Sequence, residues 1–142
     1  MFVLDTDFIF SYFDQNQSTH LQSVKLIEKY GQEEAVLSNL TKQELATVIS
    51  YKVGYQEAKD VIKKLELFNL KEYFINDTGT LEIWKLFWQF NHKKISFVDC
   101  TNLYLAKKLK LKIASFDAFY PKEMLLSLTN KEFKVQATTA SP

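Results

Sequence analysis

Short continuous apolar runs alternate along the chain with longer stretches in which apolar residues recur every three or four positions. A continuous run is typical of a strand buried on both faces, and the wider spacing is typical of a helix with one apolar face. The runs predict strands over residues 2–4, 35–38, 73–75 and 112–116, and a last edge strand over 133–135. The spacing predicts helices over residues 7–13, 21–30, 41–53, 58–65, 81–91 and 98–109.

Strands and helices therefore alternate throughout. This order indicates βαβ crossovers and an α/β fold with a mostly parallel sheet of about five strands between helices. A chain of 142 residues can form one domain with a substantial core. We expect that domain to span residues 1–136 and residues 137–142 to form a frayed tail.

Acidic residues stand at the ends of these elements. Asp5 and Asp117 each follow a predicted strand, Asp99 begins a helix, and Glu44 lies in the first turn of another. Strand carboxyl ends and helix N-termini share one edge of such a sheet, so the four carboxylates are expected to converge there. Converged carboxylates repel one another, and a hard divalent cation such as Mg²⁺ or Mn²⁺ relieves that repulsion. The pattern therefore predicts a metal site suited to phosphodiester hydrolysis.

Each acidic residue also has a local explanation. Glu44 can complete a capping box with Thr41, and Asp99 can favour a helix N-terminus through its charge. Asp7 is better explained as a helix N-cap than as a catalytic group, and Asp117 can serve as a turn residue. The prediction of a metal site therefore rests on the combination of acidic positions.

Charge and composition narrow the possible partners. The net charge is +1, so no global basic field favours nucleic acid, and all 18 basic residues are Lys. Without Arg, phosphate contacts must use Lys, backbone N–H groups or a metal. Lysines at 93–94 and between 107 and 112 form either an ordinary solvated face or a track for an RNA backbone.

Other composition features concern assembly and location. The 12 Phe, 7 Tyr and 2 Trp exceed what a small core usually needs, so we expect part of them to form a homodimer interface. The single Cys100 excludes an internal disulfide framework. We find no apolar run as long as a membrane span and no basic signal-peptide region, and we therefore expect a cytoplasmic protein without membrane contact.

Four short motifs occur in order between Phe2 and Tyr120. They are Asp5-Thr6-Asp7, Thr41-x-x-Glu44-Leu45, Ser96-x-x-Asp99-Cys100 and Ser115-Phe116-Asp117-x-x-Tyr120. Together they resemble the four motifs of the PIN-domain nucleases. The compact size resembles the VapC-type toxins of bacterial and archaeal toxin–antitoxin pairs.

The resemblance implies a PIN-like three-layer fold and a metal-dependent endoribonuclease that uses Mg²⁺ or Mn²⁺. Its substrate would be RNA, with tRNA among the candidates, and its partner an antitoxin protein. The implied catalytic and metal-binding residues are Asp5, Glu44, Asp99 and Asp117. Thr6 and Ser115 would support them through hydrogen bonds.

The chain departs from the family pattern at a few positions. Cys100 stands where Ala is usual, Tyr120 where Phe is usual, and Ser115 where Thr is common. The absence of Arg is a larger departure, because many relatives use Arg for RNA or antitoxin contacts. It puts those contacts in doubt and leaves the metal site unaffected.

Four alternatives remain. A housekeeping PIN-domain RNA-processing nuclease would have the same motifs. A non-catalytic RNA-binding or partner-binding module would have the same fold, although all four acidic positions are present. Asp5-x-Asp7 also resembles the nucleophile motif of haloacid-dehalogenase-type phosphatases, but Ile9 departs from that motif and the chain is short. A receiver domain would need a lone Asp after a central strand, which residues 35–38 lack.

Overall fold

A parallel sheet with the strand order β3–β2–β1–β4 organises the chain. The computed structural model describes residues 1–91 and 94–133. Within them, the strands are β1 Phe2–Leu4, β2 Ala35–Ser38, β3 Leu70–Tyr73 and β4 Lys112–Ala114. Val3 of β1 is in register with Val36 on one side and Ile113 on the other. The first strand of the chain therefore lies inside the sheet, with a partner on each edge.

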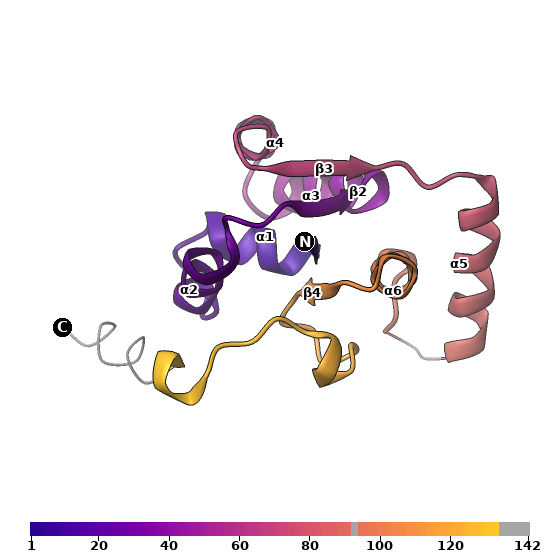
Figure 1. Cartoon of the computed structure of the whole chain (residues 1–142). Helices are drawn as coiled ribbons and strands as arrows, with labels where there is room; N and C mark the ends of the chain where they lie inside the picture. Colours follow the sequence, from indigo (N-terminus) through magenta and orange to yellow (C-terminus); the bar gives the residue numbers. More distant parts are fainter. Residues whose placement is uncertain (92–93, 134–142) are drawn as a thin grey trace.

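Helices connect the strands and cover the sheet (Figure 1). They are α1 Thr6–Phe13, α2 His20–Tyr30, α3 Asn39–Lys52, α4 Tyr55–Leu65, α5 Asp77–Phe90 and α6 Phe97–Leu109, with a short 3₁₀ helix at Lys122–Met124. In Figure 1, α5 stands beside α6, away from α1, α2 and α4.

Alternating strand residues divide the core into two clusters. Phe2 and Leu4 of β1 pack in a cluster with residues of α1, α2, α3 and α4. Val3 points to the other face and packs with Ile113 and with residues of α6 such as Leu105. Both faces of β1 are therefore covered by helices, which confirms the predicted three-layer α/β architecture.

The structure corrects the strand boundaries. Four strands are described in residues 1–91 and 94–133, where about five were predicted, and most of the predicted strand 133–135 lies outside the described residues. The third strand is Leu70–Tyr73, whereas the prediction placed it at 73–75. This is an edge strand with an exposed Lys71, so its pattern lacks the continuous apolar run of the central strands. The fourth strand ends at Ala114, whereas the prediction extended it to residue 116. The next residue, Ser115, donates a side-chain hydrogen bond to Asp5.

All six helices begin earlier than predicted, and in α1, α3 and α5 the polar residue that caps the helix explains the difference. Asp5 caps α1, Ser38 caps α3 through Thr41 N–H, and Asn76 caps α5 through Gly79 N–H. Asp77 and Thr78, which precede the predicted start of this helix, lie inside α5. In each case the N-cap precedes the first residue of the apolar period, so the period alone places the helix start too late.

No helix among the described residues is long and apolar enough to cross a membrane.

The packing of β2 gives a stability prediction. Leu37 is 0% exposed and Leu67, in the turn after α4, is 86% exposed. Leu37→Ala should lower the free energy of unfolding by about 2–5 kcal/mol, and Leu67→Ala by less than about 0.5 kcal/mol. Urea denaturation followed by circular dichroism measures both values. Equal losses in the two variants would contradict this assignment of the core.

Candidate active site

Asp5 is the most buried carboxylate at the edge of the sheet where β1 and β4 end. It follows β1 directly, caps α1, and is 3% exposed. Its carboxylate accepts hydrogen bonds from Thr6 N (2.8 Å), Asn102 Nδ2 (2.9 Å) and Ser115 Oγ (2.9 Å). These donors come from α1, α6 and the end of β4, so one side chain connects three segments that are distant in sequence.

Burial is the main cause that raises the pKa of Asp5 to about 8, and the nearby charges of Asp7 and Asp99 contribute in the same direction. The hydrogen bonds from Ser115 and Thr6 act in the opposite direction, because they stabilise the ionised form. The site therefore holds a carboxyl group that ionises with difficulty while no cation is nearby.

Asp7 belongs to the same site. Its carboxylate accepts hydrogen bonds from Phe116 N and Ser115 Oγ, both at 3.1 Å. Burial is the main cause that raises its pKa to about 6, and the charge of Asp117 adds to it. Because Asp5 is the N-cap of α1, the interpretation of Asp7 as an N-cap is wrong.

Ser115 joins the two carboxylates. Its single hydroxyl proton can be donated to only one of Asp5 and Asp7 at a time. Its oxygen accepts a hydrogen bond from Asp117 N at 3.0 Å. The hydroxyl thereby ties the end of β1 to the loop that carries Asp117.

Glu44 extends into the site from α3. Its carboxylate accepts a hydrogen bond from Thr6 Oγ1 at 2.5 Å. Because Ser38 caps α3 and Thr41 lies inside it, the capping-box explanation of Glu44 is wrong. Burial raises the pKa of Glu44, and the charge of Asp99 contributes in the same direction.

Asp99 and Asp117 have both a local role and a place in the site. Asp99 forms a capping box with Ser96 at the start of α6, and Asp117 accepts from Phe119 N in a turn. Burial raises the pKa of Asp99, with a further contribution from the charge of Asp117. Asp99 therefore does favour the helix N-terminus, and Asp117 does stabilise a turn. Neither local role excludes a role in the acidic site.

One open cavity of about 350 Å³ brings the acidic groups together. Its lining includes every acidic residue predicted for the site, together with Thr6 and the additional Asp7. Ser115 contributes through its hydrogen bonds to Asp5 and Asp7.

The donor chemistry of this cavity fits a hard divalent cation. The acidic groups offer only oxygen atoms, and the raised pKa values of Asp5 and Asp7 show the repulsion and desolvation that a cation would relieve. Among the described residues, however, no three Asp, Glu, His or Cys side chains already form a cluster around one ion position. Direct coordination of one ion by three of these side chains would therefore require them to rotate towards one another.

The sequence analysis missed the role of Asn102. This side chain is 0% exposed, donates to Asp5 and to Tyr120 OH (3.2 Å), and accepts from Thr41 Oγ1 (3.1 Å). A signal was present, because Asn102 lies on the face of the helix that also carries Val98 and Leu105. A polar residue on such an apolar face needs a buried partner.

The raised pKa values give a prediction about stability and pH. Because the folded state holds the proton of Asp5 more tightly than the unfolded state, stability is lost as pH rises from about 4 towards 8. In EDTA, Asp5→Asn should remove most of this loss and be more stable than wild type at pH 8 by on the order of 2 to 4 kcal/mol. The Asn side chain can still accept from Thr6 and can donate to Ser115, so the hydrogen bonds survive.

Urea unfolding at pH 5 and pH 8 tests this prediction, with Asp60→Asn on the exposed side of α4 as the matched control. The control should follow the wild-type pH dependence. A wild type and an Asp5→Asn variant with the same pH dependence would show that Asp5 is not destabilised by burial.

Comparison with known proteins shows to which family the chain belongs. The family model of the PIN domain matches residues 2–121. Among solved structures, the chain is similar to the toxin VapC20 of Mycobacterium tuberculosis, described as cleaving the sarcin–ricin loop, with a TM-score of 0.78 and 15% identity. The match covers 90% of this chain and 98% of that one, whereas no curated protein gives a significant match. The chain belongs to the PIN domain family.

Proposed function

We propose that the protein is a metal-dependent endoribonuclease and the toxin of a VapBC-type toxin–antitoxin pair. The observation that carries this proposal is the single cavity lined by Asp5, Asp7, Glu44, Asp99 and Asp117 in a PIN-family chain. The fold similarity to VapC20 supports the assignment as a toxin. Membership of the PIN family also sets aside the haloacid-dehalogenase and receiver-domain alternatives.

The acidic residues divide into two roles in this proposal. Asp5, Asp99 and Asp117 would hold Mg²⁺ or Mn²⁺, directly or through water, and Glu44 would complete the shell or orient the attacking water. A bound divalent cation would lower the pKa of a water molecule and neutralise charge on the scissile phosphate. Attack by water with departure of the 3′ oxygen leaves a 5′-phosphate and a 3′-hydroxyl.

The surrounding polar groups hold these carboxylates in place. Thr6 Oγ1 donates to Glu44, and Asn102 Nδ2 donates to Asp5, so neither carboxylate depends on solvent for its orientation. Ser115 fixes the distance between Asp5 and the loop of Asp117. Such support from neighbouring groups is what keeps functional side chains close to a productive geometry.

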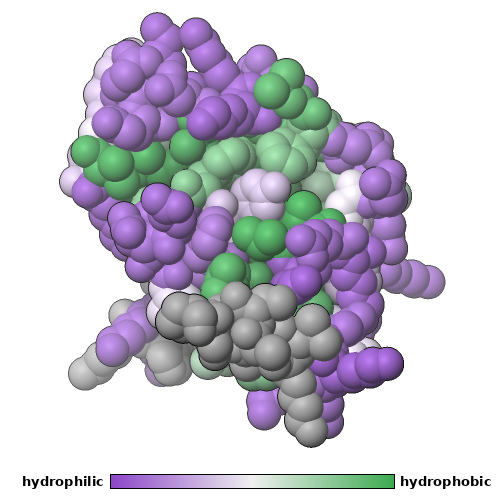
Figure 2. Space-filling model, turned by 90° about the vertical axis from the view of Figure 1, so that its left-hand side faces the viewer, coloured by the Kyte–Doolittle hydropathy of each residue, from purple (hydrophilic) through white to green (hydrophobic). Residues whose placement is uncertain are grey.

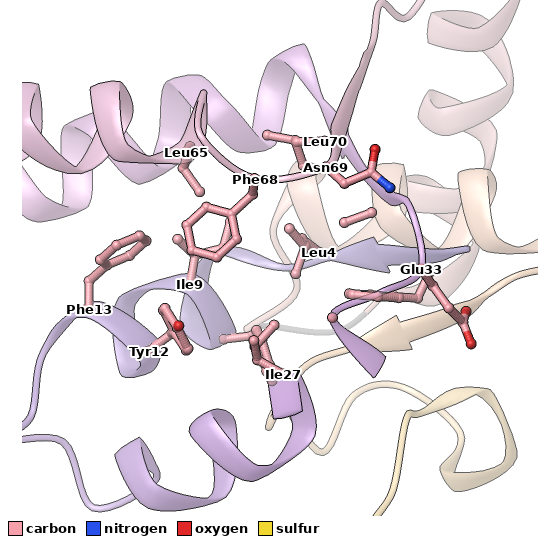
Figure 3. A pocket seen from close by; sticks show the side chains of 14 residues that line it. Leu4, Ile9, Tyr12, Phe13, Ile27, Glu33, Leu65, Phe68, Asn69 and Leu70 are labelled. Atoms are coloured by element: carbon pink, nitrogen blue, oxygen red, sulfur yellow. The ribbon is translucent and has the colours of Figure 1, made fainter. Parts of the chain in front are cut away.

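An apolar cleft offers a place for the antitoxin. Figure 2 shows hydrophobic residues in a band across one face of the molecule, between polar margins. On the same side, α1, α2 and the segment after α4 enclose a cleft into which Ile9, Phe13, Ile27, Leu65 and Phe68 project (Figure 3). An amphipathic segment of the antitoxin would bury its apolar face there.

The outer face of α5 offers a surface for a homodimer. Trp84 and Trp88 stack with ring centroids 5.7 Å apart, and Trp88 remains 69% exposed. The ring centroids of Trp84 and Phe97 lie 4.7 Å apart, so the aromatic surface formed by Trp84 and Trp88 continues onto α6. Exposed aromatic clusters of this kind are typical of protein interfaces.

Two alternative functions are compatible with the same acidic site. A housekeeping RNA-processing nuclease would cut RNA without arresting growth, and a non-catalytic module would bind RNA without cutting it. Growth arrest on expression of the wild type, relieved by a co-expressed antitoxin, separates the toxin from both.

The acidic site predicts metal-dependent cleavage. The wild type should cut a mixture of labelled structured RNAs with Mn²⁺ and not with EDTA, and Asp5→Asn should reduce the rate by roughly 100-fold or more. Asp60→Asn, with its carboxylate on the exposed side of α4, should cut like the wild type. Equal rates for wild type and Asp5→Asn would exclude Asp5 from the reaction.

The aromatic surface predicts a dimer. Light scattering at micromolar concentration should give about twice the 16.6 kDa of one chain. Trp88→Lys should shift the mass towards the monomer, whereas Tyr51→Lys, at an exposed aromatic residue of α3, should not. A wild-type mass of one chain would exclude the homodimer.

A further inference from the structure

The cavity that holds the carboxylates is also lined by residues that the proposed acidic site does not use. Phe10 and Ser11 of α1, Gln17 and Thr19 of the following loop, and Lys52 at the end of α3 line it. Lys52 is the single basic residue among the described residues that line this cavity. One cavity therefore presents several carboxylates together with one ammonium group.

The polar side chains among these residues, other than Lys52, already have hydrogen-bond partners. Ser11 Oγ and Thr19 Oγ1 are 2.6 Å apart, and Gln17 Nε2 donates to Asp14 at 3.0 Å. Lys52 instead lies over the ring of Phe10, with Nζ 5.2 Å from the centroid. It forms no ion pair within the described part of the chain, unlike Lys42, which pairs with Glu72 at 3.0 Å.

The contact with Phe10 holds the Lys52 ammonium group in place and leaves its charge unneutralised. A cation over an aromatic ring keeps its full charge and its N–H donors, which remain available to an anion. Because the chain has no Arg, a lysine has to supply any side-chain cation that contacts a phosphate.

An RNA substrate needs such a group at this position. The carboxylates can accept a scissile phosphate only together with a divalent cation, and the next phosphate along the strand still meets their field. The charge of Lys52 in the same cavity offsets that repulsion and favours one direction of the strand.

We propose that Lys52 binds the RNA phosphate next to the scissile one, so that the cavity contains a second phosphate subsite formed by Lys52 and positioned by Phe10. This proposal rests on the proposed ribonuclease function. Lys52 is a positioning residue in it, since it holds the substrate without contacting the reacting atoms.

The kinetic test compares Lys52→Ala and Lys52→Arg with Lys64→Ala. Lys64 is a matched control, because it lines a neighbouring groove together with Lys52 but does not line the acidic cavity. For the RNA that the wild type cuts fastest, Lys52→Ala should raise KM about tenfold and leave kcat within about twofold. Lys52→Arg should restore most of the affinity, and Lys64→Ala should resemble the wild type.

A binding test separates this proposal from the proposed function. In the Asp5→Asn background, anisotropy of a labelled mixed-sequence single-stranded RNA gives the dissociation constant at several salt concentrations. Loss of one phosphate contact should reduce the slope of log affinity against log salt by about 0.7 for Lys52→Ala, with no change for Lys64→Ala. This measurement does not require cleavage, so it reports on Lys52 even if the wild type cuts no RNA.

The results of the kinetic and binding tests support or overturn the proposed role of Lys52. A tenfold rise in KM with a reduced salt slope, both specific to Lys52, supports it. An unchanged KM and slope in Lys52→Ala, equal effects in Lys64→Ala, or a fall in kcat alone would overturn it. A wild type that never cuts RNA but binds it with a Lys52-dependent slope would overturn the nuclease and keep the phosphate subsite.

Discussion

The burial of the Asp5 carboxylate is the constraint on which the rest of the site depends. A carboxylate with 3% exposure loses most of its hydration, and it remains in place because three donors from separate segments replace that water. Those donors bring the start of α1, the interior of α6 and the end of β4 to one point. The arrangement of the other acidic residues follows, since each stands within a few residues of one of these segments or is held by Thr6.

The same burial opposes stability and prepares the protein for a cation. Raised pKa values at Asp5 and Asp7 mean that the folded chain holds negative charge at a cost, mainly through desolvation. A ligand that binds only the folded state and neutralises this charge stabilises it by mass action. Binding of a divalent cation and folding are therefore expected to be linked in this protein, and binding at neutral pH should release protons.

The sequence predicted the parts of the fold that have a strong local signal. Strands β1 and β2 are buried on both faces, so their apolar runs are continuous, and α4 shows its apolar period clearly. Strand β3 was misplaced because it is an edge strand with polar positions, and helix starts were misplaced because caps precede the apolar period. The identities of the acidic residues followed from their places at element ends, which the topology brings together.

What the sequence did not show depends on contacts between distant residues. Asp7 looked like a cap until the loop after β4 supplied its donors, Phe116 N and Ser115 Oγ. Asn102 looked like one polar position on a helix until Asp5, Tyr120 and Thr41 were placed around it. The partners in these hydrogen bonds are 18 to 109 residues apart, so local spacing does not reveal them. The only local sign is that a polar residue on an apolar helix face requires a buried partner.

The central claim is that the carboxylates around Asp5 hold a divalent cation. Anomalous diffraction from crystals soaked in Mn²⁺ tests it most directly, because the ion is located independently of any activity. We expect a peak at about 2.2 Å from a carboxylate oxygen of Asp5, Asp99 or Asp117, with the other ligands coming from this group or from water. A fully ordered site without a peak at millimolar Mn²⁺, or an ion bound only outside this cavity, would contradict it.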